Sequence, residues 1–182
     1  MKRLTTYVGL LRGINVAGHN KIPMPDLCTL CAKIGYSDVQ TYIQSGNLVF
    51  STSARPLAAE IELEQAIMRR FHLQISVIVR AAADWPAYVR GNPFPEESRL
   101  EPNAVMLALA KTSPKSEAVP ALRTRSTSGE RIVQVGDGLW IHFAGGVGRS
   151  KLSPALLDRL VGSPVTMRNW RTVVKLNELV VP

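Results

Sequence analysis

Strand-like and helix-like segments follow one another in the same order twice along this chain, and this order is the strongest constraint on its fold. In the first half, apolar and β-branched runs alternate with segments whose apolar residues recur at helical spacing. Residues 5–11, 38–43, 48–51 and 75–79 are predicted strands, and residues 24–34 and 56–71 are predicted helices. The order βαββαβ is that of the ferredoxin-like plait.

The pattern starts again after the turn-rich segment 91–97. Residues 104–110, 131–135, 139–143 and 164–167 are predicted strands, residues 115–123 and 153–160 predicted helices, and a last helix begins near Trp170. The helix predicted at 153–160 has suitable residues at both ends: Ser153 as its N-cap, Pro154 in its first turn and Gly162 at its C-terminal stop. We therefore predict an α+β protein of tandem ferredoxin-like (βαββαβ) halves with antiparallel sheets, over residues 1–92 and 103–182.

Composition and charge narrow the classes of function. With 46% hydrophobic residues among 182, the chain can bury a sizeable core. Its formal net charge of +8 is spread evenly over both halves, which permits an anionic partner without requiring one. No run of 18 apolar residues occurs, so we expect a cytoplasmic protein with no membrane partner.

Four segments combine glycine, amide and basic residues: residues 12–21, 44–47, 145–151 and 168–172. Glycine-rich loops between a strand and a helix turn backbone N–H groups toward phosphate or carboxylate groups. In the plait, the loop after strand one and the turn after strand two share one end of the sheet, and the segments after strands three and four share the other. The predicted ligand-binding residues are Arg12, Gly13, Asn15, Lys21, Gln44, Ser45, Gly46, Asn47, Arg149, Ser150, Lys151, Arg168, Asn169 and Thr172.

Plainer interpretations stand beside this one. Residues 44–47 also suit an ordinary hairpin turn, Arg168 also suits a partner of a carboxylate, and Trp170 also suits the core. Cys28 and Cys31 fall at core spacing in a predicted helix, so we expect them to be buried and metal-free. No known catalytic or metal-ligand motif occurs, so no cofactor and no metal site is predicted, and catalytic residues stay unassigned.

These same segments resemble a bacterial family of uncharacterised proteins, domain of unknown function 1697. Its pattern includes R-G-I-N-V-G-G, Y-I-Q-S-G-N, R-S-K-L and R-N-W, found here within residues 11–18, 41–50, 148–152 and 166–176. This chain departs from the pattern at Ala17, where the family has glycine. The resemblance implies a two-part α+β fold and brings no activity with it.

Three hypotheses for function follow from the residues. The leading one is binding of a small molecule that carries phosphate or carboxylate through the glycine-rich basic loops. The second is binding of RNA or single-stranded nucleic acid, since RNA-recognition modules share the plait. Strands one and three offer only Tyr7 and Phe50 for base stacking, and the neighbours of Phe50 suggest that it faces the core. The third is an assembly role with the loops at a self-interface; whether the protein is an enzyme stays open.

Overall fold

The computed structural model describes residues 3–181 and has a four-stranded antiparallel sheet in its first half, in the order β2-β3-β1-β4. The elements are β1 (Thr5–Leu11), α1 (Met24–Lys33), β2 (Ser37–Tyr42), β3 (Asn47–Thr52), α2 (Pro56–Phe71) and β4 (Val77–Ala81). This is the predicted βαββαβ plait, in which β1 lies between β3 and β4 and is antiparallel to both.

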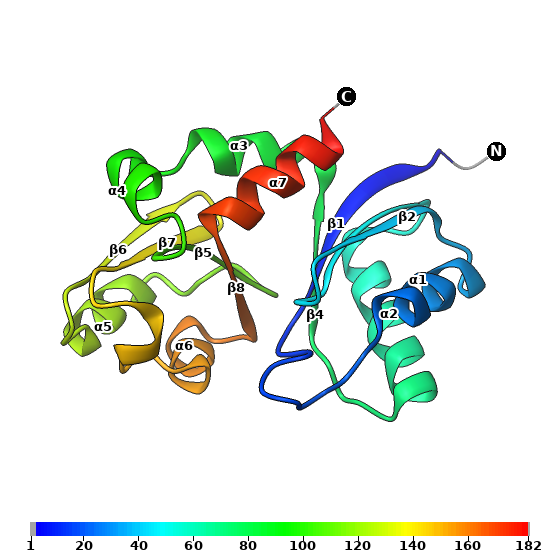
Figure 1. Ribbon diagram of the computed structural model, residues 1–182, viewed down its shortest axis with the longest axis horizontal. Coiled ribbons are helices and arrows are strands. Elements are labelled where there is room, and N and C mark those ends of the chain that lie inside the picture. The colour runs from blue at the N-terminus through cyan, green and yellow to red at the C-terminus, as the bar shows by residue number, and fades with distance from the viewer. Residues whose placement is uncertain (1–2, 182) are drawn as a thin grey trace. The chain divides into compact units, whose positions relative to one another are not determined.

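Helices α1 and α2 cover one face of this sheet (Figure 1). Alternate residues of each strand face the helices, as the period of two in a strand requires. Tyr7 and Phe50 are among them, and the Phe50 ring stacks on Tyr36 with 4.6 Å between ring centroids. The prediction that Phe50 faces the core is confirmed.

The second half repeats the arrangement, with a four-stranded antiparallel sheet in the order β6-β7-β5-β8. Its elements are β5 (Val105–Ala110), α5 (Ala118–Arg125), β6 (Glu130–Val135), β7 (Gly138–Phe143), α6 (Pro154–Val161) and β8 (Val165–Asn169). Ser153 caps α6 by accepting a hydrogen bond from the N–H of Leu156, and Gly162 ends the helix in the left-handed conformation. The tandem ferredoxin-like fold is therefore confirmed.

The remaining helices are α3 (Trp85–Arg90), α4 (Pro95–Leu100) and α7 (Trp170–Val180), with short 3₁₀ turns η1 (Ala82–Asp84) and η2 (Val147–Arg149). The face of the second sheet opposite α5 and α6 lies beneath aromatic side chains of these segments. The Phe94 ring packs near His142 at 5.9 Å, and the Trp170 ring packs near Trp140 at 5.8 Å. Residues 95–97, predicted as part of a linker, instead begin α4, since Pro95 occupies a helix N-terminus where proline is tolerated.

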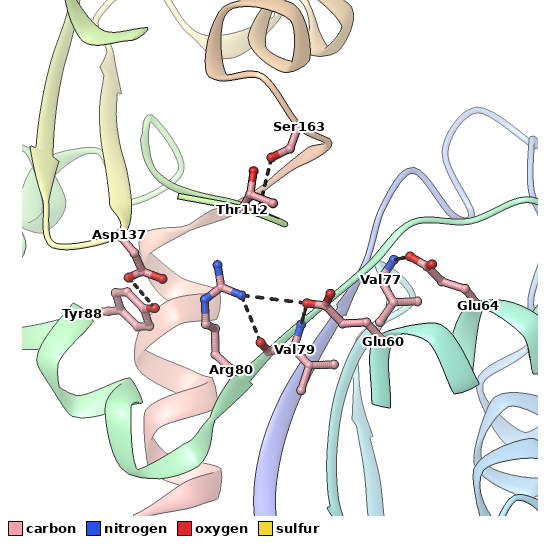
Figure 2. Close-up of polar contacts among 9 residues, drawn as sticks. All are labelled: Glu60, Glu64, Val77, Val79, Arg80, Tyr88, Thr112, Asp137 and Ser163. Atoms are coloured by element: carbon pink, nitrogen blue, oxygen red, sulfur yellow. Dashed lines mark hydrogen bonds and ion pairs between the residues drawn. The ribbon is translucent and has the colours of Figure 1, made fainter. Parts of the chain in front are cut away.

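The outer edge of the first sheet is protected by carboxylates of α2 (Figure 2). Glu64 accepts a hydrogen bond from the N–H of Val77 at 2.8 Å, and Glu60 accepts one from the N–H of Val79 at 2.9 Å. Both N–H groups belong to β4, the edge strand. They are not available to a strand from another molecule.

The second half repeats this protection. The N–H of Val165, at the start of the edge strand β8, donates to Asp158 of α6 at 2.9 Å. Arginines also recur: the guanidinium Nη1 of Arg80 donates to the carbonyl of Val79, as Arg168 does to Met167. The repeat predicted from the order of segments thus extends to individual hydrogen bonds.

By compactness the chain divides into two units, one of residues up to 85 together with those from 176 onward, the other of residues 86–175. The domain bounds proposed from the sequence, 1–92 and 103–182, stay a prediction. Over residues 3–181, no helix is both long and apolar enough to cross a membrane.

Candidate functional site

The loop after β1 and the turn between β2 and β3 meet at one end of the first sheet. The N–H of Leu11 donates to the carbonyl of Gly46 at 2.8 Å, and the amide of Asn15 donates to the carbonyl of Gln44 at 2.7 Å. The plait topology predicted this meeting of residues 12–21 with residues 44–47. We call these two segments together the loop pair.

Asn15 fixes the loop pair from within. Its Nδ2 donates to the carbonyls of Ile22, at 3.0 Å, and of Gln44, while its Oδ1 accepts the N–H of Ile22 at 2.9 Å. Its φ of 54° is left-handed, a conformation in which asparagine is enriched. The side-chain amide therefore holds the loop rather than presenting its polar atoms outward.

Gly46 is required by close packing. A Cβ at this position would stand 2.7 Å from the Cβ of Leu11 and 2.8 Å from the Cδ1 of Ile14, and the φ of +77° adds strain for any other residue. Close packing against Leu11 and Ile14 therefore explains why position 46 is a glycine.

Asn47 and Ser45 organise the turn. Asn47 is fully buried, and its Nδ2 donates to the carbonyl of Tyr42 at 2.9 Å and to the hydroxyl of Ser45 at 3.0 Å. Two of the predicted ligand-binding side chains therefore have structural hydrogen bonds here.

The tip of the first loop is a tight turn. Val16 and His19 form an isolated antiparallel bridge, with the N–H of His19 bonded to the carbonyl of Val16 at 2.9 Å. The two central residues, Ala17 and Gly18, have φ of 48° and 81°, the signs that a type I′ turn requires. The glycine of the family pattern at position 17 is thus explained by the turn itself.

Replacing Ala17 with glycine should stabilise the protein. An L-residue in the left-handed region costs roughly 1 kcal/mol that glycine avoids, and the greater freedom of glycine in the unfolded chain offsets part of this gain. We expect Ala17→Gly to raise the free energy of unfolding by about 0.5 kcal/mol in urea denaturation. A loss of stability instead would show that the alanine methyl group makes a favourable contact.

Left-handed backbone is concentrated at this end of the sheet. Of six non-glycine residues with positive φ in the described chain, four lie in or beside the loop pair: Asn15, Ala17, Asn20 and Ile43. Ile43 is the most unusual, because a β-branched residue strongly disfavours φ of 49° and its side chain is still 51% exposed. Strain of this kind persists where surrounding structure enforces it, and it clusters at functional sites.

The side chains left at the surface of the loop pair are mainly cationic or amide-bearing. Lys21, His19 and Gln44 are exposed, and Arg12 is half-buried, with its backbone N–H bonded to the carbonyl of Ser76 at 2.9 Å. Gly13, with φ of 65°, lets the chain turn directly after Arg12. Arg12 and Lys21 therefore bring positive charge to a backbone that hydrogen bonds hold from within.

The glycine-rich loop of the second half follows β7. Arg149 and Lys151 are exposed, while Ser150 is held inward: its hydroxyl donates to the carboxylate of Glu130 and accepts the N–H of Leu152 at 3.1 Å. Glu130 also accepts the N–H of Ser128 at 2.9 Å. Glu130 was not among the predicted site residues, because in the sequence it is only a carboxylate at the start of a β-rich segment.

Ser150→Ala should destabilise the protein in a pH-dependent way. Burial by itself would raise the pKa of Glu130, but hydrogen bonds from Ser150 and from the backbone lower it below its ordinary value of 4.5. A carboxylate with a depressed pKa adds stability above its unfolded pKa and loses it as the pH falls through the folded one. We expect Ser150→Ala to lose about 1 to 2 kcal/mol at pH 7.

This deficit should shrink as the pH falls below 4.5 and through the lowered pKa of Glu130, because the carboxyl group then becomes protonated. Urea denaturation of the parent and variant across this range measures it. A deficit that does not vary with pH would mean that the hydroxyl stabilises only the N–H of Leu152.

The segment after β8 lies at the same end of the second sheet as this loop, as predicted. Phe143, at the end of β7, donates its N–H to the carbonyl of Ala104, and Asn169, at the end of β8, pairs with Met106. The glycine-rich loop after β7 and the segment after β8 thus lie at the same end of the sheet, with the start of β5 between them.

The polar residues of this last segment have structural partners. Asn169 caps α7 by accepting the N–H of Thr172 at 3.0 Å, and its Nδ2 donates to Asn103. Thr172 is buried. The sequence analysis placed Arg168 after the last strand, but Arg168 lies within β8 and is only 7% exposed.

Arg168 nevertheless keeps its charge. Burial lowers its pKa to about 10, which is still well above neutral pH. Its Nη1 donates to the hydroxyl of Thr166 and the carbonyl of Met167, each at 2.8 Å. Whether it also contacts a ligand stays a prediction.

The cysteines show only part of what the sequence predicted. Cys31 is buried, and burial raises the pKa of its thiol to about 12, which leaves it unreactive at neutral pH. Cys28 is half-buried rather than buried, because it lies at the margin of the α1 core face. Within residues 3–181, His, Cys, Asp and Glu form no group of three or more that could hold a metal ion.

The geometry defines a tandem ferredoxin-like α+β protein with a strained, cation-bearing loop pair on its first sheet. The chain belongs to the family described as protein of unknown function (DUF1697), whose model matches residues 4–140. A conserved bacterial protein from Streptococcus pneumoniae, SP0830, has a similar structure with a TM-score of 0.75. The two are 21% identical, over 98% of this chain and 100% of that one, which supports the fold alone. No curated protein matches the chain.

Proposed function

We propose that the loop pair binds a small molecule carrying phosphate or carboxylate. The observation that carries the proposal is that different residues hold the backbone and supply the charge. The backbone is held by Asn15, Gly46 and Asn47. The positive charge comes from Arg12 and Lys21. A rigid backbone with cations at its rim lowers the entropic cost of holding an anion. Ile43 adds support, because a β-branched residue with a φ of 49° is strained and strain of this kind clusters at functional sites.

The chemistry of such a site is recognition. Arginine can hold a phosphate or carboxylate through two parallel hydrogen bonds, and lysine adds a mobile point charge. The amide of Gln44 supplies a donor and an acceptor for groups around the anion.

Binding of anions should depend on Arg12 and Lys21. We expect calorimetric titration at low salt with inorganic phosphate, pyrophosphate, citrate and adenosine monophosphate to find binding of at least one. Arg12→Ala or Lys21→Ala should then weaken it by about tenfold, the effect of one lost charge-assisted hydrogen bond. Lys33→Ala is the matched control, because it removes the same charge from the exposed last turn of α1 and should leave binding unchanged.

An equal loss in Lys33→Ala would mean that net charge alone attracts the anions. The absence of binding by all four anions would reject the proposal. A steep salt dependence with short RNA, at about −0.7 per phosphate contacted, would favour the nucleic-acid hypothesis.

The sheets give little support to base stacking. In the first sheet Tyr7 and Phe50 face the helices, which leaves the half-buried Tyr42 at the end of β2, and in the second sheet Trp140 is fully buried. An RNA-recognition module needs aromatic residues exposed on its open sheet face.

A second candidate is assembly through the loop pair. Val16 and Ile43 expose 60% and 51% of their surfaces there, and exposed apolar side chains are common at protein interfaces. Sedimentation velocity distinguishes the candidates: a dimer that dissociates on Ile43→Asn favours assembly, and a monomer favours the anion site.

A further inference from the structure

The loop between β5 and α5 has the same place in the second half of the chain as the first loop of the loop pair has in the first half. The N–H of Arg12, directly after β1, donates to the carbonyl of Ser76 at 2.9 Å. The N–H of Lys111, directly after β5, donates to the carbonyl of Pro164 at 3.0 Å. Each acceptor directly precedes the edge strand of its sheet. Lys111 is therefore the counterpart of Arg12 in the structural repeat.

This second loop and the end of α6 line an open basin on the surface of the unit 86–175. We call this surface the α6 basin. Its polar and glycine residues are Lys115, Asp158, Arg159, Gly162 and Ser163. The two cations, Lys115 and Arg159, are exposed and come from different segments of the chain.

The side chain of Lys115 lies against the end of α6. Gly162 ends this helix with a φ of 97°, and a Cβ there would stand 2.5 Å from the Cε of Lys115 and 3.2 Å from its Cδ. The aliphatic part of Lys115 therefore packs on the bare backbone of Gly162. The N–H of Lys115 also donates to the carbonyl of Val161 at 3.3 Å. A lysine that is packed in this way loses less freedom on binding an anion than a freely solvated one.

Ser163 adds a hydroxyl group to the α6 basin. Its Oγ accepts the N–H of Thr112 at 3.2 Å (Figure 2). A serine hydroxyl that accepts a hydrogen bond keeps its own proton for another acceptor. The same hydrogen bond joins the loop after β5 to the segment after α6, so both sides of the basin are held together.

The carboxylates near the basin have structural hydrogen bonds. Asp158, which lines the basin, accepts the N–H of Val165 at 2.9 Å through its Oδ1. Glu117, two residues after Lys115, is exposed and accepts the hydroxyl of Ser116 at 3.0 Å. The lining thus holds two cations against one carboxylate that already serves the sheet edge. A surface hollow with an excess of one charge concentrates ions of the opposite sign.

We infer that the α6 basin binds a phosphate group of a small molecule, at a site separate from the loop pair. Lys115 and Arg159 supply charge-assisted hydrogen bonds, and the hydroxyl of Ser163 supplies a neutral one. Donors from three residues suit the several oxygens of a phosphate better than the two oxygens of a carboxylate. No residue of the loop pair takes part, so either site can bind without the other.

Nitrogen–proton NMR spectra recorded during titration with pyrophosphate at low salt test this inference. The backbone N–H signals of Thr112, Lys115 and Ser163 should shift and saturate, and acetate should bind at least about tenfold more weakly. Arg159→Ala and Lys115→Ala should each weaken pyrophosphate binding at these signals by about tenfold, because each removes one charge-assisted hydrogen bond. Arg12→Ala, in the loop pair, should leave it unchanged.

Arg125→Ala is the matched control, because it removes the same charge from the exposed last turn of α5, which has eight residues as α6 does. An arginine at either position complements the dipole of its helix, so the comparison isolates the basin. Arg125→Ala should bind pyrophosphate like the parent, and the spectra themselves verify that each variant folds. Equal weakening in Arg125→Ala, acetate binding as tight as that of pyrophosphate, or the absence of saturable shifts at Thr112 and Ser163 would overturn the inference. So would pyrophosphate shifts confined to the loop pair, a result that would still support anion binding there.

Discussion

Asn15→Ala should cost roughly 3 kcal/mol of unfolding free energy, a larger loss than a surface substitution gives. The change removes three hydrogen bonds, to the carbonyls of Ile22 and Gln44 and from the N–H of Ile22. Ile22 is fully buried, so its backbone groups have little access to water in compensation. The left-handed φ of 54° adds a penalty for alanine. Chemical denaturation measures the loss.

Asn20→Ala is the control for this prediction. Asn20 also has a left-handed φ, of 50°, but its side chain makes one exposed hydrogen bond, to the carbonyl of Gly13 at 2.9 Å. We expect it to lose about 1 to 2 kcal/mol, so the difference between the variants isolates the additional bonds of Asn15. If Asn15→Ala lost less than Asn20→Ala, the Asn15 amide would not be the group that joins the two loops, and it would become a candidate contact for the ligand.

The fold follows from the sequence because the signals for its elements are local. The alternation of 5–11 and the helical spacing of 56–71 depend on near neighbours, and the order βαββαβ then limits the topology. Residues 95–100 were missed because a proline followed by acidic residues is typical of a loop as well as of a helix start. The choice is made by contacts that the sequence does not show, including the hydrogen bond from Asn92 to Ser98 at 2.7 Å.

The meeting of the loop pair was predictable because parallel strands joined by a crossover end at the same side of a sheet. The sequence did not predict which of these side chains hold the loops and which remain at the surface. The sequence predicted ligand contacts for Asn15, Asn47 and Ser150. Amides and hydroxyls in glycine-rich loops can bind a ligand or hold the loop itself, and the sequence does not distinguish the two. Only the positions of Gln44, Tyr42 and Glu130 reveal their partners.

Position 17 shows how a family glycine can mislead. A glycine in a basic loop suggests close approach of the backbone to a ligand, and the alanine here then suggests a damaged site. With φ of 48° at Ala17 and the bridge between Val16 and His19, the turn accounts for the glycine without a ligand. The alanine therefore costs stability and gives no evidence against binding.

Arg168→Ala should also cost roughly 3 kcal/mol, because a long buried side chain leaves a cavity and its partners lose their donor. Arg168 is 7% exposed, and its Nη1 serves both Thr166 and Met167. Arg12→Ala should stay within about 1 kcal/mol of the parent, since Arg12 is half-buried and lies in a loop. Urea denaturation of the two variants at pH 7 compares them directly.

Arg168→Met separates packing from charge in this result. Methionine restores much of the volume and removes a buried positive charge, a replacement that is often close to neutral when the fill is good. We expect Arg168→Met to recover most of the stability lost in Arg168→Ala, since burial already disfavours the charged guanidinium. If Arg168→Met were as unstable as the alanine variant, the charge itself would be required, and its hydrogen bonds in β8 would matter more than the space it fills. If both variants kept the parental stability, Arg168 would return to the set of side chains available for an anion.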